Sequence, residues 1–171
     1  TEDPIERARR TVVRAQMGFG TSALVRARTG FRRTSHRNKK TGYASDWAEY
    51  HNTIAAIVER LQGVCIERAD ALDLIHTLDG PDVLFYVDPP YVHSTRGKVS
   101  GSHGYAYEMT DDQHRDLAAA LHGVEGMVVL SGYHSDLYDD LYGDWRRVER
   151  SARAQGNRGT VDRVEVLWLN A

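Results

Sequence analysis

The chain has 171 residues, of which 22 are Lys or Arg and 24 are Asp or Glu, and 41% are hydrophobic. This length suits one domain of ordinary size, and the composition excludes an intrinsically disordered chain. No apolar run reaches the roughly eighteen residues of a transmembrane helix, and residues 1–15 lack the apolar segment of a secretory signal. The single cysteine, Cys65, excludes an intramolecular disulfide framework. Together these features predict a cytoplasmic protein.

The net charge of −2 is unevenly distributed along the chain. Residues 1–40 carry eleven Lys or Arg against three Asp or Glu, a net charge of +8. The remaining 131 residues carry eleven basic against 21 acidic side chains, a net charge of −10. A basic arm on an acidic body is the pattern expected where one edge of a protein meets a polyanion. A solvated basic helix face is the alternative that charge alone leaves open.

The N-terminal part predicts two helices separated by an irregular basic loop. The first helix begins at Asp3, an N-cap residue, followed by Pro4 in the first turn, and ends near Gly18. Residues 26–45 show no apolar periodicity and are predicted to form the loop. A second helix is expected from residue 45 or 46 to Leu61, with its apolar side chains on one side.

Beyond Gly63 the sequence alternates between strand and helix patterns. A short apolar strand is expected at Val64–Glu67, which would place Cys65 in the core. Asp70 can cap a helix that ends at Leu78. The remaining expected elements are strands at 83–87 and 127–131, helices from 110 and over 134–141, and an antiparallel pair at 145–150 and 164–169. This order predicts an α/β fold with a mostly parallel sheet and an antiparallel C-terminal pair.

The motif Asp88-Pro89-Pro90-Tyr91 follows directly after the expected strand at 83–87. Ligands of open α/β sheets bind at this carboxyl end of a strand. The two prolines fix φ and remove two backbone donors, which makes the segment a rigid ledge. Asp88 offers acceptor oxygens to an amine, and Tyr91 offers a flat face on which a base can stack. A turn aspartate followed by proline is the purely structural alternative.

These residues resemble the catalytic motif of the amino-methylating DNA methyltransferases. Residues 85–92 and the later segments 105–116, 128–133 and 165–170 are similar to the D12 class of DNA adenine methylases of bacteria and phages. The resemblance implies a partial Rossmann-like methyltransferase sheet. It also implies direct methyl transfer from S-adenosylmethionine to the amino group of an adenine flipped out of double-stranded DNA. Methylation of the cytosine N4 amine is the alternative, but the related motif of those enzymes usually begins with Ser.

The resemblance also implies roles for individual residues. The catalytic set would be Asp88, Pro89, Pro90 and Tyr91, with Asp88 and the Pro89 carbonyl holding the adenine amine and Tyr91 stacking on its ring. The cofactor-binding set would be Asp70, Ala71 and Asp88. For Asp70, a helix N-cap role is the structural alternative.

The resemblance divides the chain into a helical target-recognition region, residues 1–62 with the basic loop 26–42, and a catalytic core, residues 63–171. The residues expected to contact DNA are Arg28, Arg32, Arg33, Arg37, Lys39 and Lys40 in the basic loop, and His93, Ser94 and Tyr105 after the motif. The histidines near the motif are irregularly spaced and have no Cys partner, so no metal site is expected.

The cofactor-binding glycine motif of the family, Phe-x-Gly-Gly-Gly or a variant, is missing from this sequence. The segment Gly18-Phe19-Gly20 does not follow an apolar strand, so it is rejected as the cofactor loop. The chain starts at Thr1 and is expected to begin in the middle of a methyltransferase, with a missing segment or a second chain completing the cofactor pocket. We therefore expect residues 1–171 alone to bind S-adenosylmethionine weakly and to methylate poorly, which calorimetry would contradict by showing tight binding. A truncated DNA-binding remnant without methyl-transfer activity is the remaining alternative.

Overall fold

The computed structural model describes residues 2–18, 43–95, 107–156 and 159–170. The chain divides into two compact units, residues 1–67 and residues 68–171, and each is described by itself. The expected basic loop 26–42 lies outside the described residues. Within the described ranges, no helix is long and apolar enough to cross a membrane.

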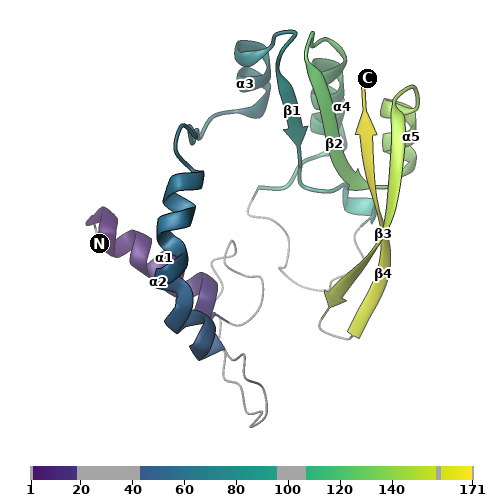
Figure 1. Ribbon diagram of the computed structural model, residues 1–171. Coiled ribbons are helices and arrows are strands. Elements are labelled where there is room, and N and C mark those ends of the chain that lie inside the picture. Colours follow the sequence, from purple (N-terminus) through teal and green to yellow (C-terminus); the bar gives the residue numbers. More distant parts are fainter. Residues whose placement is uncertain (1, 19–42, 96–106, 157–158, 171) are drawn as a thin grey trace. The chain divides into compact units, whose positions relative to one another are not determined.

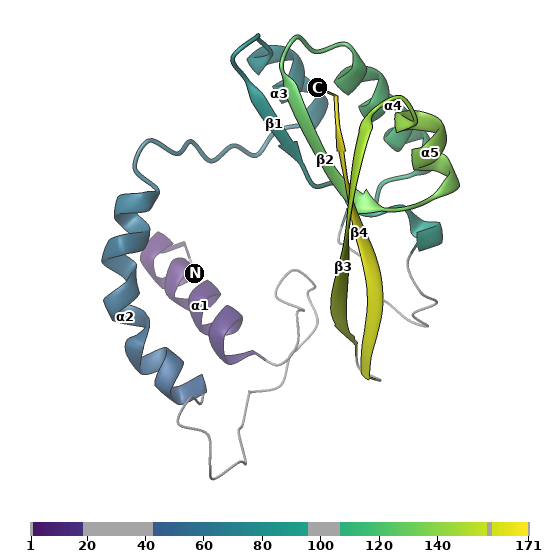
Figure 2. The same cartoon turned by 45° about the vertical axis from the view of Figure 1, so that its right-hand side comes forward.

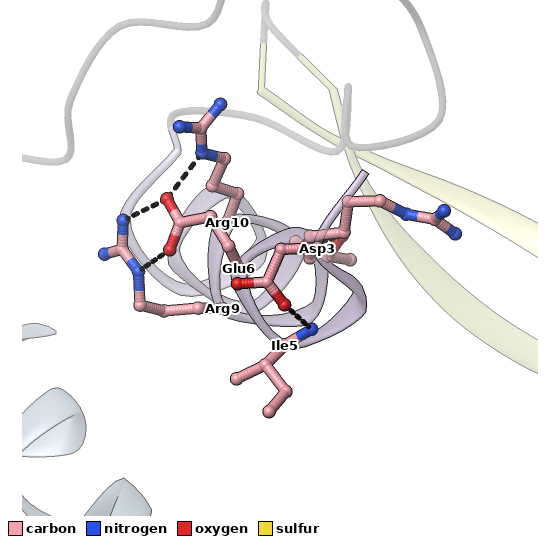
Figure 3. Close-up of polar contacts among 7 residues, drawn as sticks. Asp3, Ile5, Glu6, Arg9 and Arg10 are labelled. Atoms are coloured by element: carbon pink, nitrogen blue, oxygen red, sulfur yellow. Dashed lines mark hydrogen bonds and ion pairs between the residues drawn. The ribbon is translucent and has the colours of Figure 1, made fainter. Parts of the chain in front are cut away.

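The first unit contains two helices that contact each other, α1 (Pro4–Met17) and α2 (Tyr43–Arg60). The Asp3 side chain accepts a hydrogen bond of 2.9 Å from the Ile5 backbone N–H, so the predicted N-cap is confirmed (Figure 3). Helix α2 begins two residues before the predicted start and ends one residue before the predicted end.

The carboxylate of Glu6 pairs with two of the basic side chains of α1. Its oxygens lie 2.6 Å from Nε of Arg9 and 2.7 Å from Nε of Arg10 (Figure 3). Hydrogen bonds from these two guanidinium groups lower the pKa of Glu6 to about 2. Part of the positive charge of residues 1–40 is therefore balanced within α1 itself.

Hydrophobic side chains of the first unit are not buried in its described part. On α2 and just beyond it, the exposed fractions of Ile54, Ile57, Val58 and Leu61 lie between 43% and 59%. The described part of this unit therefore has no hydrophobic core of its own, and the residues that build the core belong to the second unit.

The second unit is a four-stranded sheet with helices (Figure 1). Its elements are α3 (Ala71–Leu78), β1 (Leu84–Val87), the 3₁₀ turn η1 (His93–Thr95), α4 (Asp111–His122), β2 (Met127–Tyr133), α5 (Asp136–Tyr142), β3 (Arg146–Gly156) and β4 (Gly159–Leu169). The strand order is β1-β2-β4-β3, and the two views show β3 and β4 as one long hairpin (Figures 1 and 2).

The described sheet is mostly antiparallel, so the expected mostly parallel sheet is wrong for this part of the chain. Only β1 and β2 run parallel, while β2 pairs with β4 and β4 with β3 in antiparallel fashion. The physical reason is that only one connection between neighbouring strands in this part of the chain is a crossover through a helix, which parallel pairing requires. Helix α4 makes one crossover between parallel strands, whereas the β3–β4 hairpin brings β4 back antiparallel against β2. The structure is thus a mixed α/β fold that is compatible with a methyltransferase.

The expected strand at Val64–Glu67 is also wrong. This segment has no strand hydrogen bonds, and the exposed fraction of Ile66 is 88%. Cys65 is exposed rather than part of the core. An apolar segment becomes a strand only when a neighbour satisfies its backbone N–H and C=O groups, and this segment pairs with none of the four described strands.

The hydrophobic core forms where α4 and α5 pack on one face of the sheet. Every second residue of β2 and β4 points into it, and the buried side chains from these strands are Val128, Leu130, Val166 and Trp168. The Trp168 ring lies 5.1 Å from that of Tyr138 and 6.2 Å from that of Tyr142, both on α5. This aromatic cluster fixes β4 and α5 beside β2, the strand next to the motif.

A single carboxylate joins the end of α3 to the start of β2. The oxygens of Asp79 accept hydrogen bonds of 3.0 Å from the Glu125 N–H and 3.1 Å from the Gly126 N–H. These backbone donors lower the pKa of Asp79 below its ordinary value. The contact is stronger while Asp79 is ionised, so it links the turn before β1 to β2 in a pH-dependent way.

We expect the Asp79→Asn variant to have a lower melting temperature than the unchanged chain at pH 7. The difference between the two melting temperatures, called the gap below, should narrow in acid. A carboxylate with a lowered folded-state pKa stabilises the protein above its unfolded pKa of about 3.9, and this contribution disappears as the pH falls through the folded pKa. Melting temperatures followed by circular dichroism from about pH 7 to pH 3 would measure the gap. A gap that stays constant over this range would contradict the role given to the charge of Asp79.

Candidate active site

The motif Asp88–Tyr91 lies immediately after β1, at the carboxyl end of the strand. Because β2 runs parallel to β1, the carboxyl end of β2 lies at the same edge and places Ser131 beside the motif. Within the motif, Asp88 is exposed, Pro89 is buried and Tyr91 is half-buried. The Asp88 carboxylate and the Tyr91 ring are thus accessible, while Pro89 between them is held by the surrounding protein.

Ser131 holds the carboxylate of Asp88 by one oxygen. Its Oγ lies 2.9 Å from Asp88 Oδ1 and 3.3 Å from the Val87 carbonyl oxygen, and Ser131 is 7% exposed. A hydroxyl donor fixed in this way orients the carboxylate. Ser131 was not among the site residues expected from the sequence. A serine in an otherwise apolar strand next to the motif strand was the signal available.

The Ser131→Ala variant should lower the turnover number of the reaction in which Asp88 takes part about ten- to a hundredfold, because a hydrogen bond to a charged group contributes about 1.5–3 kcal/mol. Asp88 would remain in place but lose the donor that sets its orientation. Combining this change with Asp88→Ala should add little further loss, since both act through one carboxylate. Steady-state rates for the two single variants and the double variant test this, and fully additive losses would argue against the contact.

A groove of about 670 Å³ opens beside the motif. Its walls come from α3, β1 with the motif, and α4, and most of them are apolar. Carboxylates enter it from three places, namely Asp70 before α3, Asp88 in the motif and Asp116 on α4. The size and the mostly apolar lining with a few polar groups are those of a small-molecule site.

The structure brings the three expected cofactor-binding residues, Asp70, Ala71 and Asp88, into this one groove. Asp70 also caps α3, because its side chain accepts a hydrogen bond of 2.9 Å from the Leu72 backbone N–H. The capping bond uses one oxygen, Oδ1. The N-cap alternative is therefore correct, and it is compatible with a place in the groove wall.

The turn η1 carries two of the residues expected to contact DNA. His93 and Ser94 are both exposed, and His93 Nε2 lies 3.7 Å from Glu108 Oε2. The turn is closed by Thr95, whose Oγ1 donates a hydrogen bond of 2.7 Å to the Val92 carbonyl. The other expected DNA contacts, Tyr105 and the six basic residues of the loop 26–42, lie outside the described residues.

Comparison with protein families gives one match that spans most of the chain. The model for a family described as D12 class N6 adenine-specific DNA methyltransferase matches residues 4–155. The matched range includes the motif, its neighbour Ser131 and every residue that lines the groove. A comparison with curated individual proteins gives no match.

Proposed function

The chain belongs to the family of D12 class N6 adenine-specific DNA methyltransferases, and we propose that the ledge Asp88–Tyr91 holds the adenine whose N6 is methylated. The observation that carries this proposal is the position of Asp88, oriented by Ser131 at the end of β1 and bordering the groove. The family favours neither the cytosine-N4 alternative nor a remnant without methyl-transfer activity.

Asp88 would act on the amino group itself. An adenine amine donates two hydrogen bonds, one to an Asp88 oxygen and one to the Pro89 carbonyl, which Pro90 prevents from joining a helical turn. These two acceptors orient the nitrogen lone pair toward the groove. As the new C–N bond forms, the nitrogen becomes positively charged, and the nearby Asp88 carboxylate stabilises that charge and can accept the departing N6 proton.

Tyr91 would hold the ring of the adenine. The amino group of a paired base lies inside the duplex, so the adenine must leave the base stack before it can reach Asp88. A tyrosine face offers the extruded base a stacking surface, and stacking of this kind contributes about 1–3 kcal/mol per base. The half-buried position of Tyr91 next to Asp88 supports this role.

The groove fits the cofactor that DNA methyltransferases use in general, S-adenosylmethionine. Its apolar walls suit an adenine ring, and the carboxylates of Asp70 and Asp116 suit hydroxyl and ammonium donors. When bound, S-adenosylmethionine supplies an electrophilic methyl group on a sulfonium ion. We propose Asp70, Ala71 and Asp88 as its contacts, because these residues border the same groove as the motif.

For DNA recognition we propose residues 1–62, with residues 63–171 as the catalytic core. The support is the net charge of +8 on residues 1–40, a sum that already includes the Glu6 carboxylate paired in α1. This positive charge favours contact with DNA phosphates. The proposed phosphate and base contacts are Arg28, Arg32, Arg33, Arg37, Lys39 and Lys40, with His93, Ser94 and Tyr105 beside the extruded base.

We also propose that a further segment or a second chain completes the cofactor pocket. Strand β1 is the last strand at its end of the described sheet, and the groove runs along it. Two side chains of this strand, Leu84 and Tyr86, are 60% and 65% exposed. An open, apolar strand edge favours pairing with another strand.

The proposed function is tested by the identity of the methylated base. The chain would be incubated with labelled S-adenosylmethionine and DNA from a methylation-deficient host, and the digested nucleosides analysed by mass spectrometry. We expect label in N6-methyldeoxyadenosine. Label in N4-methyldeoxycytidine would contradict the proposal, whereas a low yield of label agrees with a cofactor pocket that a further segment or a second chain completes.

A further inference from the structure

Three contacts connect Arg163 on β4 with Tyr133, Tyr91 of the motif and the turn η1. The ring of Tyr91 meets the ring of Tyr133 edge-on, with centroids 4.5 Å apart and planes at 74°. The Cζ atom of Arg163 lies 5.0 Å from the centroid of the Tyr133 ring. Arg163 Nη1 also donates a hydrogen bond of 2.9 Å to the Thr95 carbonyl oxygen.

These contacts join parts of the chain that are distant in sequence. Tyr133 is the last residue of β2, Arg163 lies on β4, and Thr95 ends the turn η1 that follows the motif. Register explains why they meet, because Tyr133 lies opposite Glu165, two residues from Arg163 on the same face of β4. The guanidinium group therefore touches both the residue that supports Tyr91 and the turn that follows it.

The partners of Arg163 are unusual for a surface arginine. An arginine that only stabilises the surface most simply pairs with a carboxylate, as Arg147 does with Asp139. Arg163 instead contacts an aromatic face and a backbone carbonyl. The aromatic partner, Tyr133, is the ring that contacts Tyr91, and a planar guanidinium suits a ring face and a carbonyl acceptor at the same time.

We propose that Tyr133 and Arg163 are positioning residues that hold the Tyr91 ring at the angle at which an extruded base can stack on it. Tyr133 restricts the Tyr91 ring from its side, and Arg163 holds Tyr133 and the turn η1 together. This inference rests on the proposed role of Tyr91 and extends it to the β3–β4 hairpin. Rigid supporting contacts of this kind keep a side chain such as that of Tyr91 in the orientation that binding requires.

The first test observes the Tyr91 ring directly and needs no activity. Aromatic ¹H–¹³C spectra of the whole 171-residue chain would be recorded, with the Tyr91 signals assigned from a Tyr91→Phe variant. We expect Tyr133→Leu to shift these signals because the ring current of Tyr133 is lost, and Tyr133→Phe to keep them near their original position. Unchanged Tyr91 signals in Tyr133→Leu would overturn the proposal.

The second test separates positioning from loss of positive charge. Arg163→Gln and Arg150→Gln remove the same charge from the same hairpin, but no contact of Arg150 with the motif is present among the described residues. We expect Arg163→Gln to shift the Tyr91 signals and to lower kcat for methylation about three- to tenfold with little change in KM for DNA. We expect Arg150→Gln to leave the Tyr91 signals and kcat unchanged. Equal effects of the two variants would overturn the proposal.

Failure of the proposed function and failure of the positioning role of Tyr133 and Arg163 give different experimental results. If the label appears in N4-methyldeoxycytidine, the proposed function fails, whereas the Tyr91 spectra still decide whether Tyr133 and Arg163 hold the ring. If Tyr133→Leu does not fold, the comparison of Arg163→Gln with Arg150→Gln decides alone, since these side chains are at least partly exposed.

Discussion

Replacing Asp88 by alanine is expected to lower the turnover number for adenine methylation by about a hundred- to a thousandfold, the loss typical when one preorganised transition-state contact is removed. Asp88 is the motif's only carboxylate, and it would face the nitrogen as that atom becomes positively charged. The loss should appear in kcat rather than in KM for DNA, because the contact strengthens only as the bond forms. Initial rates with labelled cofactor measure both constants.

Two further variants show whether the loss is specific to this carboxylate. Asp88→Asn keeps one acceptor oxygen but loses the charge. Its kcat should therefore lie between that of the unchanged chain and that of Asp88→Ala. Asp82→Ala removes an exposed carboxylate from the turn before β1 and should leave kcat unchanged. Equal activity of Asp88→Ala and Asp82→Ala would rule out the proposed role of Asp88.

Replacing Trp168 by alanine should lower the free energy of unfolding of the second unit by about 3–5 kcal/mol. The indole is 1% exposed and contacts both Tyr138 and Tyr142, so its removal leaves a cavity between the sheet and α5. Urea unfolding followed by circular dichroism would measure the loss. Because most domains are stable by only about 5–15 kcal/mol, a change of this size is readily detected.

Leu84 provides the matched control for this experiment. It also lies on the sheet, but on the outermost strand β1, and it is 60% exposed. Leu84→Ala should therefore cost less than about 1 kcal/mol, because little burial is lost. If Trp168→Ala and Leu84→Ala lowered the free energy of unfolding by similar amounts, Trp168 would not occupy the core as the structure places it.

Local signals in the sequence predicted the helices of the second unit well. Asp70 was expected to cap α3 and does so, and α4 begins where a helix was expected, with Thr110 as its N-cap. At Thr110 the hydroxyl accepts from the Gln113 N–H, while the Gln113 side chain accepts from the Thr110 N–H, which forms a capping box. Such contacts lie within a few residues of each other, so a linear sequence contains all the information that they need.

Contacts between strands were not predictable in the same way. The antiparallel pair expected at 145–150 and 164–169 is confirmed as β3 and β4, but the sequence did not predict that β4 would also pair antiparallel with β2. The contact of Ser131 with Asp88 depends on the parallel register of β1 and β2. The motif itself was recognisable, because its four residues are contiguous, whereas the residues that support it come from β2 and β4.

The position of β1 has a consequence for the order in which the site forms and opens. Strands β3 and β4 are neighbours in sequence, but Asp88 and Ser131 are 43 residues apart and meet only after β1 has paired with β2. Local pairings close at a smaller entropic cost than distant ones, so the hairpin is expected to form early and the β1–β2 pair late. In the described sheet β1 has four residues and one neighbour, and such a strand exchanges its amide hydrogens more readily than β2 or β4. Transient detachment of β1 would separate Asp88 from Ser131 while the core around Trp168 stays folded.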